Sequence, residues 1–263
     1  YGSPEDFPEL LDINCNSNGG SMYDWTHCNS ISYNDELQQI LLTSRHMNEI
    51  YIIDHSTTIE EAGSNAGGKY GKGGDFLYRW GNPSIYNRNN FSDFTLNAPH
   101  AANWINNNTI LIFNNKHTTS TSSAIEINIP FDNNFIIPDS NYEGFGPSEF
   151  SWIYESNFFS LTQSGALRLP NGNTLITIHQ ADKIFEINLS GDIVWEYEGN
   201  LHSARAIKYP MDYLELSLVG DINNDHVINI LDIIQLLQQI IELNYDSNND
   251  LNSDGILNVL DLV

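Results

Sequence analysis

Residues 39–43 read Gln-Ile-Leu-Leu-Thr, residues 49–53 read Glu-Ile-Tyr-Ile-Ile, and residues 76–80 read Phe-Leu-Tyr-Arg-Trp. Short runs of β-branched and aromatic residues between Asn- and Gly-rich turns predict β-strands. The same order, two inner strands and then an aromatic outer strand, returns twice: at 109–113, 124–127 and 150–154, and at 174–178, 183–187 and 193–197. The repeated pattern predicts an all-β fold.

The spacing of the outer strands indicates a β-propeller. Trp152 and Trp195 stand 43 residues apart, which suits one four-stranded blade. Trp80 and Trp152 are 72 residues apart, so we expect insertions at 81–99 and 131–147. We count three near-complete blades and the opening of a fourth at 204–213. Because a propeller needs more blades to close its ring, we expect the N-terminal blades to lie upstream of this sequence.

Composition limits the possible partners. The 263 residues hold 10 Lys and Arg against 34 Asp and Glu, a net charge of −24. Nucleic-acid binders need a basic surface and anionic membranes attract cations, so neither partner is expected. Hydrophobic residues make up 40% of the chain, which is enough for a core, yet no apolar run is long enough to span a membrane.

A change in composition near 217–220 predicts two domains, 1–218 and 219–263. The second is acidic and contains neither Lys nor Arg. Its Leu and Ile residues recur at helical spacing over 229–243, which predicts a helix with a buried face.

The acidic domain carries two calcium-loop patterns. Residues 221–232 read Asp-Ile-Asn-Asn-Asp-His-Val-Ile-Asn-Ile-Leu-Asp, and residues 250–261 read Asp-Leu-Asn-Ser-Asp-Gly-Ile-Leu-Asn-Val-Leu-Asp. Ca²⁺ binds six to eight oxygens, and an EF-hand loop supplies them at positions 1, 3, 5, 7, 9 and 12, with the backbone carbonyl at position 7. The predicted ligands are Asp221, Asn223, Asp225, Val227, Asn229 and Asp232, and Asp250, Asn252, Asp254, Ile256, Asn258 and Asp261.

Both loops depart from the EF-hand pattern, since they end in Asp rather than Glu and the first has His226 where Gly is usual. An Asp- and Asn-rich solvated turn is the alternative, and the tandem repeat favours two calcium sites. Paired loops of this kind resemble the type I dockerin module over about 219–263. The resemblance implies calcium binding, docking on a cohesin-like or cell-surface protein, and a second helix that would follow Val263.

Two histidines are predicted to open the innermost strands of two blades. His27 lies in Asp24-Trp-Thr-His27-Cys-Asn-Ser, and His100 in Ala98-Pro-His100-Ala-Ala-Asn-Trp104. Inner strands line the central channel of a propeller, so these imidazoles should converge there. They could hold an anion, move a proton or take up a transferable group; the alternative is hydrogen bonding without chemistry.

The sequence resembles the bacterial arylsulfotransferase family over roughly 1–215. The segments that carry the resemblance are 24–33, 39–45, 49–58, 71–83, 169–176 and 204–213. The resemblance implies an exported six-bladed propeller that moves a sulfuryl group from an aryl sulfate to a phenol through a sulfated histidine, without a nucleotide sulfate donor.

The family's site residues carry over in part. His27 and His100 match family positions that bind or polarise the sulfuryl oxygens. An arginine is expected around 116–118, where only Lys116 or His117 could supply the charge, and His179 is the candidate nucleophile, not anchored to the family motif. The alternative function is a non-catalytic propeller that binds a glycan, a phenol or a protein at the cell surface.

Several other features have structural interpretations. Arg45 and Arg205 could line the channel, and structural salt bridges are the favoured interpretation for both. His46 and His55 are expected at the surface or at blade edges. The Gly-rich segment 67–74 lacks the end of a phosphate loop and predicts an inter-strand loop. Cys15 and Cys28 could form one bridge or remain free thiols.

Overall fold

A computed structural model describes residues 2–15, 23–88, 95–130, 144–200, 202–210, 213, 220–223, 225, 227–242, 244–246 and 249–262. The chain forms two compact units, Tyr1–Lys208 and Tyr209–Val263. Each unit is described by itself.

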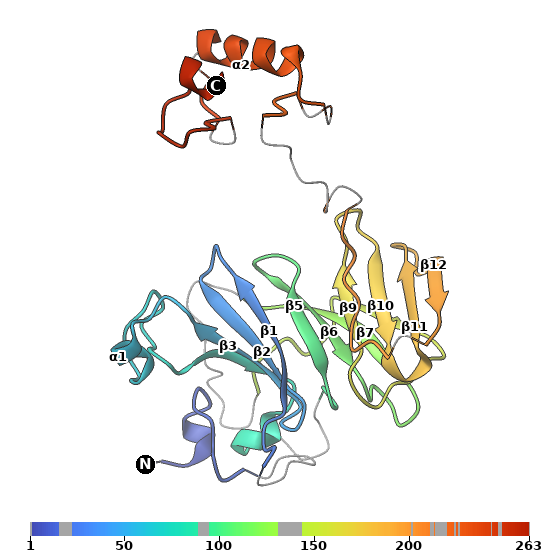
Figure 1. The fold of residues 1–263 in the computed structure, drawn as a ribbon. Coiled ribbons are helices and arrows are strands. Elements are labelled where there is room, and N and C mark those ends of the chain that lie inside the picture. The colour runs from blue at the N-terminus through green and yellow to red at the C-terminus, as the bar shows by residue number, and fades with distance from the viewer. Residues whose placement is uncertain are drawn as a thin grey trace. The chain divides into compact units, whose positions relative to one another are not determined.

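The first unit contains three four-stranded antiparallel sheets, each built from strands consecutive in sequence (Figure 1). The first sheet contains β1 (Cys28–Asn34), β2 (Gln39–Ser44), β3 (Glu49–Asp54) and β4 (Phe76–Trp80). The second contains β5 (His100–Trp104), β6 (Thr109–Asn114), β7 (Ser123–Asn128) and β8 (Trp152–Glu155), and the third β9 (Gly165–Arg168), β10 (Thr174–Ile178), β11 (Lys183–Ile187) and β12 (Ile193–Glu198). The all-β, blade-like architecture expected from the repeat is confirmed, and the described sheets do not close into a ring.

The first strands of the three sheets lie side by side. The side chain of Asn29 donates a hydrogen bond to the carbonyl of Pro99 at 2.9 Å, and that of Asn103 donates to the carbonyl of Ala166 at 3.0 Å. These bonds tie the start of β1 to the segment that enters β5, and β5 to β9. The strands predicted to be innermost are therefore the ones at which neighbouring blades meet.

The core fills the two spaces between the three sheets, and β6 contributes to both. Ile110 and Ile112 pack against the first sheet, whereas Leu111 and Phe113 pack against the third. Because successive side chains of a strand point to opposite faces, a sheet covered on both sides needs a continuous apolar run. This need explains why residues 109–113 show no polar alternation.

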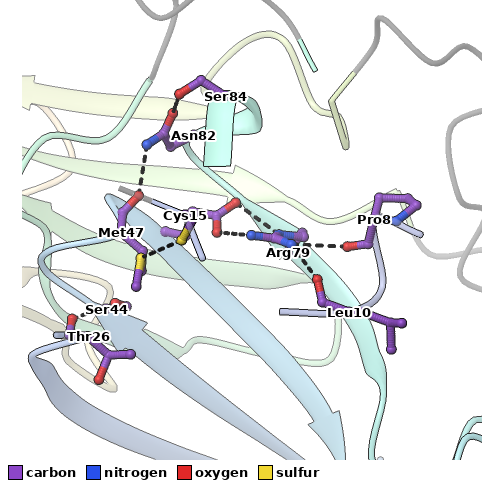
Figure 2. Close-up of polar contacts among 10 residues, drawn as sticks. Pro8, Leu10, Cys15, Thr26, Ser44, Met47, Arg79, Asn82 and Ser84 are labelled. Atoms are coloured by element: carbon purple, nitrogen blue, oxygen red, sulfur yellow. Dashed lines mark hydrogen bonds and ion pairs between the residues drawn. The ribbon is translucent and has the colours of Figure 1, made fainter. Parts of the chain in front are cut away.

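A buried arginine fastens the N-terminal segment to the first sheet. Arg79 on β4 is fully buried, and its Nη1 donates to the carbonyls of Pro8 at 3.2 Å and Leu10 at 3.1 Å (Figure 2). Its Nε donates to Oε1 of Glu49 on β3 at 3.0 Å. The single guanidinium thus joins two strands to a segment that has only the short helix η1 (Pro4–Asp6).

The remaining helices of the first unit are short. They are α1 (Ile59–Ala62), η2 (Pro83–Tyr86) and η3 (His179–Ala181). The Gly-rich segment 67–74 is an inter-strand loop between α1 and β4, as expected. The opening of a fourth blade was expected at 204–213. Residues 204–210 form no strand, so that expectation is wrong for them, and residues 211 and 212 lie outside the described part of the chain. The expected insertion at 131–147 is described only from residue 144.

The second unit contains α2 (Ile230–Glu242) and η4 (Val259–Leu262). Asn229 caps α2 by two hydrogen bonds. Its Oδ1 accepts from the N–H of Leu231 at 2.8 Å, and the N–H of Asn229 donates to Oδ2 of Asp232 at 2.7 Å. The helix expected over 229–243 is confirmed, but the prediction that its apolar face is buried is wrong, since Ile234 is 53% exposed and Ile241 79% exposed. Among the described elements of this unit only the short η4 packs on α2, and it leaves these side chains uncovered. No described helix is both long and apolar enough to cross a membrane.

Candidate functional site

The sites predicted at the starts of the inner strands come together. His27 immediately precedes β1 and His100 is the first residue of β5, and their ring centroids lie 6.4 Å apart, nearly edge to face. Both strands are irregular at this point, with shifts in register at Cys28–Ser30 and His100–Asn103. His27 also has a φ of +48°, an uncommon left-handed conformation that fixed packing must maintain.

A third histidine, not expected here, lies beside His27. The ring of His46 is 4.8 Å from that of His27 and only 6% of the residue is exposed, so its expected surface position is wrong. The turn after β2 folds back on the segment before β1: the N–H of His46 donates to the carbonyl of Thr26 at 3.2 Å, and Oγ of Ser44 donates to the same carbonyl at 2.6 Å (Figure 2). This contact buries the imidazole.

Asp24 holds both of these histidines. Its Oδ2 lies 2.5 Å from Nδ1 of His27, and its backbone carbonyl lies 2.9 Å from Nδ1 of His46. The hydrogen bond from His27 lowers the pKa of Asp24, and the charge of Arg45 lowers it further. The carboxylate therefore stays ionised and directs the imidazole of His27.

Arg45 is the arginine that the described chain brings next to His27, since its backbone N–H donates to the carbonyl of His27 at 3.1 Å. Its charge is a smaller cause that lowers the pKa of both His100 and Asp24. Its Nε is buried and has no hydrogen-bond acceptor among the described residues, so the expected salt bridge is absent there. A buried guanidinium N–H without a partner is costly, and an anion would satisfy it.

His117 does not supply the expected charge to the site. Its Nε2 lies 2.7 Å from Oε1 of Glu155 on β8, at the outer strand of the second sheet. Lys116 is half-buried, and its backbone N–H donates to the carbonyl of Asn97 at 3.0 Å.

His100 is neutral. The side-chain N–H groups of Asn115 donate to the carbonyls of Ser160 and Gln163, so its Oδ1 faces Nδ1 of His100 at 2.8 Å. Nδ1 therefore carries the proton, and Nε2 accepts from the N–H of Gln163 at 3.2 Å. Burial is the main cause that lowers the pKa of His100 from 6.5 to about 4.

His179 lies at the start of η3, beside the segment that contacts His100. Its N–H donates to Oγ of Ser164 at 3.0 Å, and its Nδ1 lies 3.1 Å from the carbonyl of Ser203. Because a carbonyl only accepts, Nδ1 carries a proton, and in the neutral ring the lone pair is on Nε2. In the described part of the chain His179 makes no ring contact with His27 or His100.

Farther along the three inner strands is a cavity of about 180 Å³. Residues of β1, β5 and β9 line it together with Arg205, Ala206 and Ile207. Arg205 is exposed and forms no salt bridge within the described residues, contrary to expectation. His55 is exposed, as expected, and its ring packs on Tyr33 at 5.0 Å. Cys15 and Cys28 are free thiols.

The two predicted calcium loops share a set of internal hydrogen bonds. The last carboxylate of each accepts from the third and ninth backbone N–H groups: Asp232 from Asn223 and Asn229, and Asp261 from Asn252 and Asn258. Asp232 is 2% exposed and Asp261 1% exposed. Two anionic side chains are thus buried in a segment that has no cationic residue of its own.

The sequence did not predict Asp24 and His46 for the site, and it offered Arg45 only as a residue that could line the channel. A signal for them was present. Cys28 pairs with Ser44 in the antiparallel ladder of β1 and β2, so residues just before β1 and just after β2 must be neighbours. Arg45 and His46 follow the predicted strand 39–43 and lie opposite His27 in this pairing, so the sequence could have assigned them to the same site.

Residues 11–130 match the family model described as arylsulfotransferase (ASST). The match supports an arylsulfotransferase-like protein and confirms that part of the resemblance. A search of curated proteins found no match.

Solved structures similar to the chain include a protein of unknown function from Bacteroides caccae, at 12% identity and a TM-score of 0.37, covering 65% of this chain and 45% of that one. A streptogramin B lyase has 12% identity and a TM-score of 0.32, covering 73% and 44%. BamB from Moraxella catarrhalis has 12% identity and a TM-score of 0.35, covering 66% and 38%. The chain thus spans less than half of each of these structures, and likeness at this level carries no information about activity.

Proposed function

We propose that the first unit transfers a sulfuryl group from an aryl sulfate to a phenolic acceptor. The observation that carries the proposal is the buried Nε of Arg45, which has no acceptor among the described residues, on a residue whose backbone bonds to that of His27; this donor suits a sulfuryl oxygen. The family match of residues 11–130 supports the same chemistry.

The geometry favours His100 as the nucleophile. A neutral imidazole whose Nε2 carries a lone pair can attack sulfur but cannot donate a hydrogen bond from that atom to an oxygen. In the first step the Nε2–S bond forms, the S–O bond to the aryl group breaks, and the phenolate leaves. The hydrogen bond from Gln163 must be given up for this attack.

Arg45 and His27 then act on charge and protons. Arg45 donates to the sulfuryl oxygens, and the imidazolium form of His27, whose Nδ1–H is held by Asp24, gives the proton on Nε2 to the departing phenolate. In the second step His27 takes the proton of the acceptor phenol, the new S–O bond forms and the Nε2–S bond breaks. No electrons are gained or lost, and no nucleotide is needed.

His179 remains the second candidate for the nucleophile, since its Nε2 lone pair has no hydrogen-bond partner among the described residues. Mass spectrometry separates the two. The protein is incubated with an aryl sulfate and no acceptor, digested, and searched for a histidine that carries one added SO₃. A sulfated His100 supports its assignment as the nucleophile, and a sulfated His179 would make His179 the nucleophile instead. If neither the wild type nor any variant releases phenol, the proposal of sulfuryl transfer is overturned.

A non-catalytic binding role is the alternative, and one observation favours it. Nε2 of His100 is engaged by the N–H of Gln163, so the histidine is not free in this conformation. A propeller that binds a phenol or a glycan would need no free nucleophile. Binding of an aryl sulfate without turnover, measured by calorimetry, would favour this function.

We propose further that the second unit binds two Ca²⁺ ions and docks on a cohesin-like partner of an exported assembly. The support is the duplicated hydrogen-bond pattern and the burial of Asp232 and Asp261 without cationic residues nearby in sequence. The fitted ligands would be the carboxylate and amide oxygens of both loops and the carbonyls of Val227 and Ile256. Calorimetry with Ca²⁺ tests it: a stoichiometry of two supports the proposal and no binding overturns it. Recovery of the gene product from the medium or the cell envelope tests export.

A further inference from the structure

Asp24, His27 and His46 bring three metal-binding groups together. One ligand atom from each residue can be chosen so that all three lie within 4.8 Å of one another. No other group of three or more His, Cys, Asp and Glu side chains among the described residues meets this condition. The three residues come from the segment before β1 and the turn after β2. The sheet therefore positions them independently of any bound ion.

The two imidazoles would present different atoms to an ion. Nδ1 of His46 faces the carbonyl of Asp24, so that nitrogen carries a proton and Nε2 of the neutral ring carries the lone pair, which is the second-shell pattern of histidine ligands in metal sites. Nδ1 of His27 lies 2.5 Å from Oδ2 of Asp24. An ion bound by both of these residues would take the place of the proton between the two atoms, because Nε2 lies on the far side of the ring from the carboxylate.

We propose that Asp24, His27 and His46 bind a late first-row divalent cation, of which Zn²⁺ is the model. Two imidazoles and one carboxylate form the donor set that Zn²⁺ accepts in sites that keep a position open for a further ligand. Imidazole nitrogens exclude the hard ions Ca²⁺ and Mg²⁺, which require oxygen. The proposal goes beyond sulfuryl transfer, because binding of the ion needs neither substrate nor turnover and excludes, while the ion is bound, the proton transfer proposed for His27.

The surroundings set the strength of this site. His46 is 6% exposed, whereas the side chains of Asp24 and His27 are 50% and 39% exposed, so solvent and ions reach the cluster from the side of Asp24 and His27. The charge of Arg45 lowers the pKa of Asp24, and the neutral ring of His100 faces His27. Because Arg45 opposes a dication, the affinity should be below that of a closed structural zinc site.

Cobalt tests the proposal spectroscopically. The full chain is freed of metal by chelation, saturated with Ca²⁺ so that the acidic loops are occupied, and titrated with Co²⁺. We expect visible d–d absorption of Co²⁺ bound by nitrogen ligands, and displacement of these bands by one equivalent of Zn²⁺. His46→Gln and Asp24→Asn should each weaken Co²⁺ binding by about 10- to 100-fold or more.

His55→Gln is the matched control, because His55 is an exposed histidine of the same unit outside the cluster. It should leave the cobalt spectrum unchanged. Absence of the bands in the folded wild type, or bands of equal strength in His46→Gln and Asp24→Asn, would overturn the site. Since buried His46 contributes to packing, Asp24→Asn decides the outcome if His46→Gln is misfolded by circular dichroism.

Discussion

The backbone N–H of Gln163 donates a hydrogen bond to Nε2 of His100 at 3.2 Å. Gln163 precedes β9 and His100 begins β5, so the bond joins the inner ends of two blades. It fixes the tautomer of the imidazole together with Asn115, while burial is the main cause that keeps this histidine neutral and the charges of Arg45 and His27 act in the same direction. The same bond connects the stability of the blade interface to pH.

Stability of the first unit should fall as the pH drops from 6.5 to about 4. The pKa of His100 is lowered from 6.5 to about 4 by burial, so between these values the unfolded chain binds a proton that the folded chain excludes. The free energy of unfolding that neutral His100 contributes is fully present above pH 6.5 and is lost below about pH 4. It amounts to roughly 3 kcal/mol. Urea unfolding followed by tryptophan fluorescence measures it, because all five tryptophans lie in this unit.

His100→Gln provides the comparison for this pH effect. The variant has no group that titrates at this position, so its free energy of unfolding should change less between pH 7 and pH 4 than that of the wild type. Equal slopes in the two proteins would contradict the assignment of a neutral, buried His100.

Arg45→Gln should lower kcat for sulfuryl transfer by about 100- to 1,000-fold. Its guanidinium would stabilise charge that develops on the sulfuryl oxygens, and removal of one such donor from an active site typically has an effect of this size. The KM for the aryl sulfate should change less than kcat. Lys183→Gln, at an exposed ion pair with Glu196 on β11 and β12, is the control and should retain full activity. An active Arg45→Gln variant would exclude the proposed role.

Arg79→Met should destabilise the first unit by about 3–5 kcal/mol, because it leaves the carboxylate of Glu49 buried without its partner. Both side chains are completely buried, and the N-terminal segment loses two hydrogen bonds to Arg79 at the same time. Lys183→Met removes a largely solvent-exposed pair and should change the free energy of unfolding by less than about 1 kcal/mol. Urea unfolding of both variants checks the contrast, and similar losses would contradict it.

The sheets could be predicted from the sequence because a strand in a two-sided core must be apolar throughout, as residues 109–113 are. The positions of His27 and His100 followed from the strands that they begin. His46 was missed and Arg45 was expected first in a salt bridge, since the place of both depends on the register of β1 with β2, which pairs Cys28 with Ser44. A single strand pattern does not state which residues lie opposite each other across a turn.

The apolar face of α2 shows a different limit. Helical periodicity predicts which side chains share a face, and Ile230, Ile234 and Ile241 do recur in that way. Periodicity cannot supply the surface that covers them, and in the described second unit these residues are 64%, 53% and 79% exposed. Burial depends on a neighbouring element, and that information lies outside the local pattern.

The two proposed calcium loops should differ in affinity, with the second tighter. Gly255 occupies position 6 of the second loop at a φ of +83°, and its N–H donates to Oδ2 of Asp250 at 2.8 Å. The first loop has His226 at this position, and a side chain raises the energy of a left-handed backbone by roughly 1–2 kcal/mol. Calorimetry of the wild type should therefore resolve two Ca²⁺ affinities that differ by about tenfold.

Gly255→Ala should remove this difference between the loops. No atom lies within 4 Å of the added Cβ, so the substitution introduces backbone strain without a clash. Asp221→Ala and Asp250→Ala, which delete the first ligand of each loop, identify which site is which, since each should leave one Ca²⁺ bound. The tighter site should be the one lost in Asp250→Ala. If the tighter site survives Asp250→Ala and disappears in Asp221→Ala, the position-6 argument is wrong.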